Sequence, residues 1–311
     1  MKKTIAAIGE CMLELSRSPS ALNHDRNNTA LSYGGDTLNT AVYLSRLGQA
    51  VSYVTALGDD PLSDEMIESW QLENIDCSLV DRHEGAVPGL YFIDTDASGE
   101  RSFLYWRDQA PAKRLFDSTE NAERIFSVLA TFDYVYLSGI TLAIFTDASR
   151  HRLLAWLPTY REAGGKVIFD NNYRPRLWPS ADEARACYSD LYAMTDIALP
   201  TLDDECLVFG RSSEDDCLQR LLDAGVSEIV LKLGAQGCRV RTMSEDKRIS
   251  AYSVAVRDTT AAGDSFNAGF LARRLGGATL SDAADLGCRL ASIVVQHPGA
   301  IVDKELLSNL Q

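Results

Sequence analysis

A run of small residues that ends in an acid offers the clearest chemistry in this chain. It reads Asp258-Thr259-Thr260-Ala261-Ala262-Gly263-Asp264 and leads into a helix-like segment. The start of a helix leaves backbone N–H groups unpaired and partly positive, so it can hold a phosphoryl group. Asp264 at that point can take a proton from a hydroxyl nucleophile. The pattern favours phosphoryl transfer from a nucleotide to an alcohol, and the alternative is a plain strand-to-helix turn capped by Asp264.

A second glycine-rich helix start lies near the N-terminus. Gly34 and Gly35 precede a helix-like run that ends at Gly48. Paired glycines let a ligand approach the backbone closely, and Asp36 and Asn39 offer an acceptor and a donor to sugar hydroxyls. Asp36 could instead be an ordinary acid in a first helical turn. Two such starts in one chain suggest that one holds the acceptor and the other the transferred phosphate.

Alternating strands and helices must position these two turns. Strand-like runs cover residues 4–8, 51–57, 134–137, 166–170, 196–199 and 228–232. Helix-like runs cover residues 32–47, 61–73, 119–130, 147–163, 203–209 and 213–224, with two more helices in 263–296. This alternation predicts an α/β fold with a mostly parallel sheet that is covered on both faces.

An aromatic hairpin interrupts that alternation. Residues 89–95 and 101–107 are strand candidates joined by a turn at 96–100. Tyr91, Tyr105 and Arg107 share one side of this hairpin, which favours a lid over a site, an oligomer contact, or both. For Phe92 and Phe103, packing in an edge hairpin is an equal alternative.

Composition excludes several classes of protein. The chain has 311 residues and a formal net charge of −14, without a basic stripe, so nucleic acid is not an expected partner. No apolar run reaches the roughly 20 residues of a membrane span. The seven cysteines are widely spaced and form no Cys-x-x-Cys pair, which indicates reduced thiols and a cytoplasmic protein. No Gly-x-Gly-x-x-Gly follows the first strand, which disfavours a nicotinamide-dependent dehydrogenase.

These motifs together resemble the ribokinase-like (PfkB) carbohydrate kinase family. The resemblance runs from Gly9 to about Gly299, and the two signature regions match residues 34–48 and 258–269. A finer match, to kinases of sugar acids, is carried by residues 34–39, 88–91, 105–107 and 169–178. The family implies one ribokinase-like three-layer α/β/α sandwich over residues 1–311, with a small β-sheet lid formed by about 12–33 and 87–110. It also implies ATP as the phosphoryl donor, Mg²⁺ as cofactor and direct in-line transfer to the terminal hydroxyl of the sugar.

The resemblance assigns roles residue by residue. Asp264 matches the catalytic base, and Arg174 matches a residue between the acceptor and the transferred phosphate. The anion-hole turn matches Ala261, Ala262 and Gly263. The acceptor contacts match Gly34, Gly35, Asp36, Asn39, Tyr91, Tyr105 and Arg107. The residues that border the nucleotide match Asn172, Lys232, Gly234 and Gly237, together with Ala261 and Gly263.

Two positions depart from the family pattern. Many members have glycine where this chain has Ala261, and an alanine there costs little if its φ is negative. The usual Asn-x-x-Glu near the metal and phosphates is Thr201-Leu202-Asp203-Asp204 here. Asp204 is therefore the candidate metal residue, directly or through a water, and Glu205 competes with it.

A sugar acid carries a carboxylate, and the planar donor fork of arginine matches its two oxygens. Arg107 on the aromatic hairpin is the best candidate for that contact, and a solvated surface arginine is the alternative. Arg174, Arg176 and Asp170 could instead form a structural ion-pair cluster, and Gly234 and Gly237 could form only a hairpin turn. A neutral-sugar kinase such as a fructokinase, a nucleoside kinase and a catalytically silent sugar-binding regulator remain as alternative functions. The aromatic lid suggests a dimer or a higher homo-oligomer.

Overall fold

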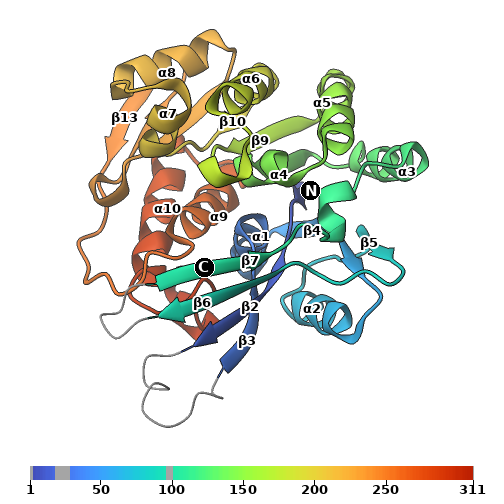
Figure 1. The fold of residues 1–311 in the computed structure, drawn as a ribbon. Coiled ribbons are helices and arrows are strands. Elements are labelled where there is room, and N and C mark those ends of the chain that lie inside the picture. The colour runs from blue at the N-terminus through green and yellow to red at the C-terminus, as the bar shows by residue number, and fades with distance from the viewer. Residues whose placement is uncertain (1–2, 18–28, 96–100, 311) are drawn as a thin grey trace.

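A large, mostly parallel sheet forms the centre of the molecule (Figure 1). In the computed structural model, which describes residues 3–17, 29–95 and 101–310, nine strands form this sheet in the order β13-β12-β11-β10-β9-β8-β1-β4-β5. The strands are β1 (Thr4–Ile8), β4 (Ala50–Gly58), β5 (Val80–His83), β8 (Tyr134–Ser138), β9 (Lys166–Asp170), β10 (Ile197–Ala198), β11 (Glu228–Lys232), β12 (Cys238–Arg241) and β13 (Asp246–Ile249). All neighbours from β11 to β5 pair in parallel, whereas β12 and β13 pair antiparallel at the edge. The predicted α/β class is confirmed.

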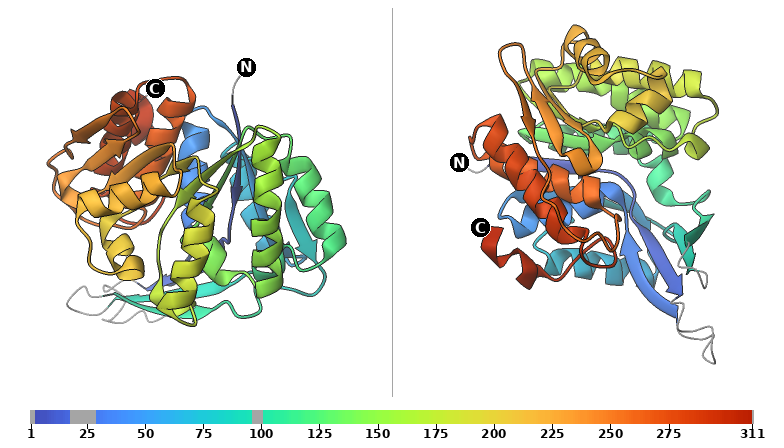
Figure 2. Two further views of the ribbon diagram at one scale, coloured as in Figure 1. Left: turned by 90° about the horizontal axis from the view of Figure 1, so that it is seen from above. Right: turned by 90° about the vertical axis from the view of Figure 1, so that its left-hand side faces the viewer.

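Helices cover both faces of the sheet, as the view from above in Figure 2 shows. One face packs against α1 (Asp36–Arg46), α2 (Pro61–Leu72), α9 (Ala262–Leu275) and α10 (Leu280–Val294). The other packs against α3 (Thr119–Leu129), α4 (Gly139–Ile144), α5 (Asp147–Glu162), α6 (Ala181–Tyr192), α7 (Leu202–Phe209) and α8 (Glu214–Asp223). Alternate residues of the strands enter the two cores: Ile5 and Ala7 point to one, Ala6 and Ile8 to the other. This gives the three layers expected of the sandwich.

A smaller four-stranded sheet projects from the carboxyl end of β1 (Figure 1). Its strands are β2 (Met12–Arg17), β3 (Thr29–Gly34), β6 (Leu90–Thr95) and β7 (Arg101–Trp106), in the order β3-β2-β6-β7. The predicted hairpin is confirmed as β6 and β7, with Tyr91 opposite Tyr105. Its turn at 96–100 lies outside the described residues. We call this small sheet the lid.

One helix boundary differs from the sequence prediction. The run predicted as a helix from residue 32 begins as strand β3, and α1 starts only at Asp36. Leu31 and Tyr33 pair with Leu15 and Leu13 of β2. Their alternation therefore belongs to a strand, because pairing with a distant segment overrides the local helical pattern.

Short 3₁₀ turns complete the described elements: η2 (Pro111–Arg114), η3 (Pro175–Leu177), η4 (Gly234–Gln236) and η5 (Lys304–Leu310). Among the described helices, none combines the length and the apolar character needed to cross a lipid bilayer.

Candidate active site

A cavity of about 450 Å³ lies between the lid and the carboxyl ends of the central strands. Ligands of open α/β sheets bind outside these strand ends. Most of the predicted site residues line the cavity. They are Gly34, Gly35, Asp36, Asn39, Tyr91, Tyr105, Asn172, Arg174, Asp204, Lys232, Ala261, Ala262, Gly263 and Asp264. The cavity therefore brings both glycine-rich turns together with the aromatic hairpin.

Asp264 lies in the first turn of α9 and is 8% exposed. The Asn39 side-chain amide donates to its carboxylate at 2.8 Å, which joins the first turns of α1 and α9. Burial, followed by the nearby charge of Asp36, raises the pKa of Asp264 to about 8. A carboxyl group with a pKa near the working pH is well matched to accepting a proton from an alcohol.

The turn before α9 has a backbone conformation that the sequence did not lead us to expect. An alanine at position 261 was expected to cost little if its φ were negative, but Ala261 has φ +57°, in the left-handed region. The left-handed conformation lets the chain reverse directly into the helix, with the Ala262 N–H on the Thr259 carbonyl at 3.2 Å and the Ser265 N–H on the Ala261 carbonyl at 2.8 Å. The turn is therefore formed here by a strained alanine, whose Cβ is crowded in this conformation.

The paired glycines of the first turn are required by close approaches. A Cβ on Gly34 would lie 2.4 Å from the Tyr91 hydroxyl, and a Cβ on Gly35 would lie 2.2 Å from the Glu10 carbonyl oxygen. The Tyr91 hydroxyl donates to Glu14, a lid carboxylate that sequence reasoning missed. The glycines thus let the lid close on the start of α1.

Asp36 faces the loop that follows β9. Asn172 in that loop donates to the Asp36 carboxylate at 2.7 Å. Asn172 has φ +23°, a conformation that asparagine tolerates better than most residues. Burial raises the pKa of Asp36. The predicted acceptor residue Asp36 and the predicted nucleotide residue Asn172 are therefore direct neighbours.

A charged network lies beneath the start of α9. Lys232, at the end of β11, donates to Asp170 at 3.0 Å and to Asn267 at 3.1 Å. Asn267 also donates to Asp170 at 2.7 Å. A Cβ on Gly263 would be 3.5 Å from the Lys232 Nζ, so the ammonium group lies next to the anion-hole turn. Asn267 was missed, although its spacing of three residues from Asp264 places both on one face of a helix.

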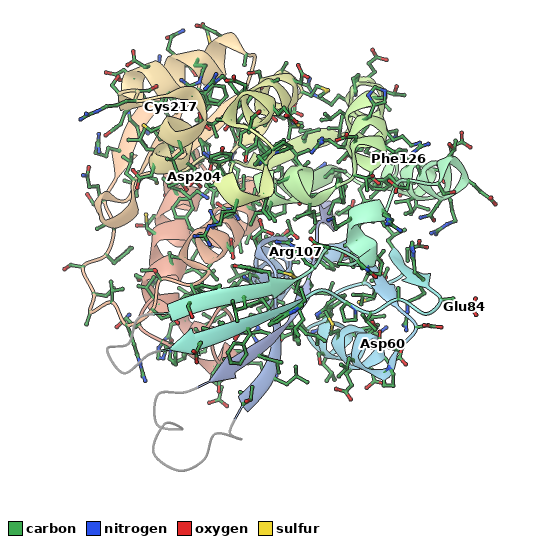
Figure 3. All side chains as sticks on the ribbon, viewed as in Figure 1. Asp60, Glu84, Arg107, Phe126, Asp204 and Cys217 are labelled. Carbon is green, nitrogen blue, oxygen red and sulfur yellow. The ribbon has the colours of Figure 1, made fainter. Side chains whose placement is uncertain are left out.

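The two acids that compete for the metal are separated by the fold. Asp204, which is labelled in Figure 3, is one of the residues that line the cavity. Its carboxylate accepts from the Tyr173 backbone N–H at 3.2 Å, and burial raises its pKa. Glu205 is fully buried, forms an ion pair with Arg220 at 2.6 Å and accepts from Asn171 at 3.1 Å. Glu205 therefore anchors the loop after β9 to α7, whereas Asp204 faces the ligand space.

Three predicted residues are not among those that line the cavity. Gly234 and Gly237 have φ values of +56° and +90° and form the tight turn between β11 and β12, closed by the Leu233 N–H on the Gly237 carbonyl at 2.8 Å. Arg107 lies where the lid meets the core and forms an ion pair with Glu10 (Figure 3).

Among residues 3–17, 29–95 and 101–310, no group of three or more His, Cys, Asp or Glu side chains is arranged to hold a metal ion. Mg²⁺ in phosphoryl-transfer sites binds through one or two carboxylates plus phosphate oxygens and water. Asp204 and Asp170, which both line the cavity, fit that donor set.

Comparison with known proteins gives consistent matches over the whole chain. A family model described as pfkB family carbohydrate kinase matches residues 2–306. A 2-dehydro-3-deoxygluconokinase from Dickeya dadantii (strain 3937) is 51% identical, over 98% of this chain and 98% of that protein. A 2-dehydro-3-deoxygluconokinase from Escherichia coli (strain K12) is 47% identical, over 99% of each chain. The crystal structure of a PfkB protein from Polaromonas sp. JS666 superposes with a TM-score of 0.85 at 24% identity, covering 99% of this chain and 100% of that chain.

Proposed function

The chain belongs to the pfkB family of carbohydrate kinases, and on that premise we propose that it phosphorylates 2-dehydro-3-deoxygluconate with ATP. The products are ADP and 2-dehydro-3-deoxy-6-phosphogluconate, formed at the C6 hydroxyl. The observation that carries the proposal is Asp264, buried at the start of α9 in a cavity that the first turn of α1 and the lid also line.

The reaction is an in-line displacement. Asp264 takes the proton of the C6 hydroxyl as its oxygen attacks the γ-phosphorus of ATP, and the bond to the bridging oxygen of ADP breaks. The N–H groups at the start of α9, together with Lys232 and Arg174, offset the negative charge on the transferred phosphoryl group. The lid covers the cavity, which keeps water from competing with the sugar as acceptor.

A metal ion would enter the site together with the nucleotide. Asp204 would hold Mg²⁺, directly or through water, with Asp170 beside it, and the ion would neutralise charge on the phosphates of bound ATP.

The acceptor occupies the side of the cavity lined by the lid and α1. Asp36 and Asn39 bind sugar hydroxyls, and the Tyr91 and Tyr105 rings, whose centroids lie 6.0 Å apart, form the lid wall. We assign the carboxylate that distinguishes this acceptor from a neutral sugar to Arg107, which does not line the cavity itself but lies near the cavity-lining Met12. All seven cysteines are free thiols, which supports a cytoplasmic location for the enzyme.

The lid supports a homo-oligomer. Leu31, Leu15, Phe92 and Leu104 lie in one register row across β3, β2, β6 and β7. This row faces away from the cavity, because Tyr91 and Tyr105 alternate with Phe92 and Leu104 along their strands. Leu31 and Leu104 are 50% and 53% exposed, and Trp106 beside them is 57% exposed. An apolar face of this kind is typical of an interface, here with a second copy of the lid.

A substrate panel tests the function. Purified enzyme with MgATP is offered 2-dehydro-3-deoxygluconate, 2-dehydro-3-deoxygalactonate, gluconate, fructose and ribose, and ADP release is followed by a coupled assay. We expect the highest kcat/KM for the first acid, and an Asp264→Asn variant that is slower by about 10²–10⁴-fold. Faster turnover of fructose or ribose would assign the enzyme to neutral sugars. No turnover of any acceptor would leave a sugar-binding regulator.

A further inference from the structure

A buried ion pair joins the core to the base of the lid. Glu10 follows the end of β1, and Arg107 is the first residue after β7. Arg107 donates through Nη2 to Glu10 Oε2, and the two side chains are 12% and 1% exposed. The pair therefore fixes the position of the guanidinium group that we assign to the acceptor's carboxylate.

The pairing is incomplete in the described part of the chain. Glu10 Oε1 and Arg107 Nε are buried, and neither has a hydrogen-bond partner there. By contrast, Arg46 binds Glu73 through both Nε and Nη2, at 2.8 and 2.7 Å, as a structural arginine–carboxylate pair commonly does. A buried polar atom without a partner is unfavourable and calls for an explanation, and a missing ligand is one.

Glu10 Oε1 and the base of the Arg107 side chain lie close to Met12, a residue of the cavity wall. A Cβ on Gly89 would lie 2.9 Å from Met12 Cγ, 3.0 Å from Glu10 Oε1 and 3.3 Å from Arg107 Cβ. Met12 lines the cavity, so its side chain borders both the cavity and the space beside Gly89 that Glu10 Oε1 also borders. Methionine side chains repack easily, which makes this part of the wall displaceable.

We propose that Glu10 is a positioning residue that sets the enzyme's preference for an acid over a neutral sugar. Glu10 holds one nitrogen of the Arg107 guanidinium and leaves Nε for an oxygen of the acceptor's carboxylate, which reaches it when Met12 moves aside. The inference rests on the proposed function, because it requires an acceptor that carries a carboxylate. Burial raises the pKa of Glu10 and the charge of Arg107 opposes that rise, so the two groups depend on each other.

A double-mutant cycle tests this inference. We expect Glu10→Gln to raise KM for 2-dehydro-3-deoxygluconate by tenfold or more, with kcat changed by less than threefold. Arg107→Met should raise KM at least as much. Because Glu10 acts through Arg107, adding Glu10→Gln to Arg107→Met should change KM by less than twofold. If Glu10→Gln does not fold, Glu10→Asp keeps the charge but withdraws it by one methylene, and it should raise KM with kcat retained.

Glu73→Gln is the matched control, since it breaks a half-buried Arg46–Glu73 ion pair that does not line the cavity. It should lower Tm and leave KM unchanged. An unchanged KM in both Glu10 variants, beside a raised KM in Arg107→Met, overturns the inference and leaves the proposed function intact. Independent, multiplying effects of Glu10→Gln and Arg107→Met overturn it as well. An unchanged KM in Arg107→Met would show that Arg107 does not bind the acceptor's carboxylate. If the wild-type enzyme phosphorylates no sugar acid, the proposed function itself is wrong.

Discussion

Asp264 lies in a buried position that disfavours the charged form of its carboxyl group. Burial and the charge of Asp36 raise its pKa to about 8, so a proton is held through neutral pH in the ligand-free protein. As the proposed catalytic base, Asp264 must be deprotonated to accept the proton of the hydroxyl group. We therefore expect kcat/KM to fall as the pH is lowered through about 8, which a pH–rate profile on 2-dehydro-3-deoxygluconate measures. A profile that stays flat from pH 6 to 9 would contradict this assignment.

The raised pKa of Asp264 also makes the free energy of unfolding depend on pH. The folded protein holds this proton more tightly than the unfolded chain does, so the contribution is favourable at low pH and is lost as the pH rises through about 8. Asp264→Asn should therefore gain in Tm relative to wild type as the pH is raised from 5 to 8, by about 2–4 °C for each kcal/mol recovered. Thermal denaturation of both proteins across this range measures the difference. A Tm difference that does not vary with pH would argue against a buried, shifted carboxyl group.

Sequence reasoning located the site residues that carry obvious motifs and missed their supports. Asp264, Asp36 and Asn39 stand in glycine-rich helix starts and could be found by pattern. Glu14 carries no such signal and Asn267 carries only its helical spacing from Asp264, because their contacts with Tyr91 and Lys232 come from distant elements. Glu205 could not be separated from Asp204 by spacing, since only the packing of α7 buries one of them and exposes the other to the cavity.

At the level of elements, the turn before α9 contains a strained residue, Ala261, and a substitution can relieve that strain. An alanine in the left-handed region destabilises the folded protein by about 1–2 kcal/mol, and glycine relieves this strain. Glycine also stabilises the unfolded chain by about 0.4–1 kcal/mol through its greater backbone entropy, which offsets part of the gain. Ala261→Gly should therefore stabilise the protein by up to about 1.5 kcal/mol and leave Tm equal or higher by a few degrees. Turnover should change by less than about threefold, because the backbone N–H groups keep their positions.

The neighbouring residue gives the control for this prediction. Ala262 lies in the helical region as the first residue of α9, so Ala262→Gly should lower stability by about 0.5–1 kcal/mol. Thermal denaturation and steady-state kinetics on the two variants measure both effects. Destabilisation by Ala261→Gly as large as that by Ala262→Gly would show that the left-handed turn is not strained.

The elements themselves were predictable where their pattern is local. The central strands and the amphipathic helices follow from hydrophobic periodicity, and α2, α5 and α8 end within about two residues of the predicted bounds. The start of α1 was displaced because β3 is defined by its partner β2. Helices α4 and α6 were not predicted, since short or mostly polar runs carry little signal before they pack.

At the level of the whole molecule, the lid presents one face to the cavity and an apolar face outwards. If that outer face is an interface, Leu104→Glu should convert the oligomer into monomers at micromolar concentration, because a charge would be buried between two lids. Light scattering coupled to gel filtration measures the mass. Met243→Glu is the control, since Met243 is also exposed, at 83%, but lies between β12 and β13. A wild-type monomer, or equal effects of the two variants, would contradict a lid interface.

The three-layer arrangement could be predicted because the strand–helix alternation allows few alternatives. The order of the strands could not, nor could the position of the lid over the strand ends. Both depend on which distant segments pack together. Gly34 and Gly35 are required by such packing, but this is recognised only when the structure shows the Tyr91 and Glu10 atoms that lie against them.

The hydrogen bond between Asn39 and Asp264 spans 225 residues of chain. A ribosome adding roughly 5–20 residues per second needs about 10–45 s to pass from one to the other. During that interval the nascent polypeptide carries the proposed sugar-binding turn without the carboxylate that we propose as the catalytic base. We therefore expect a chain that ends before Asp264 to lack kinase activity, because the two turns of the proposed site meet only after most of the protein has been made.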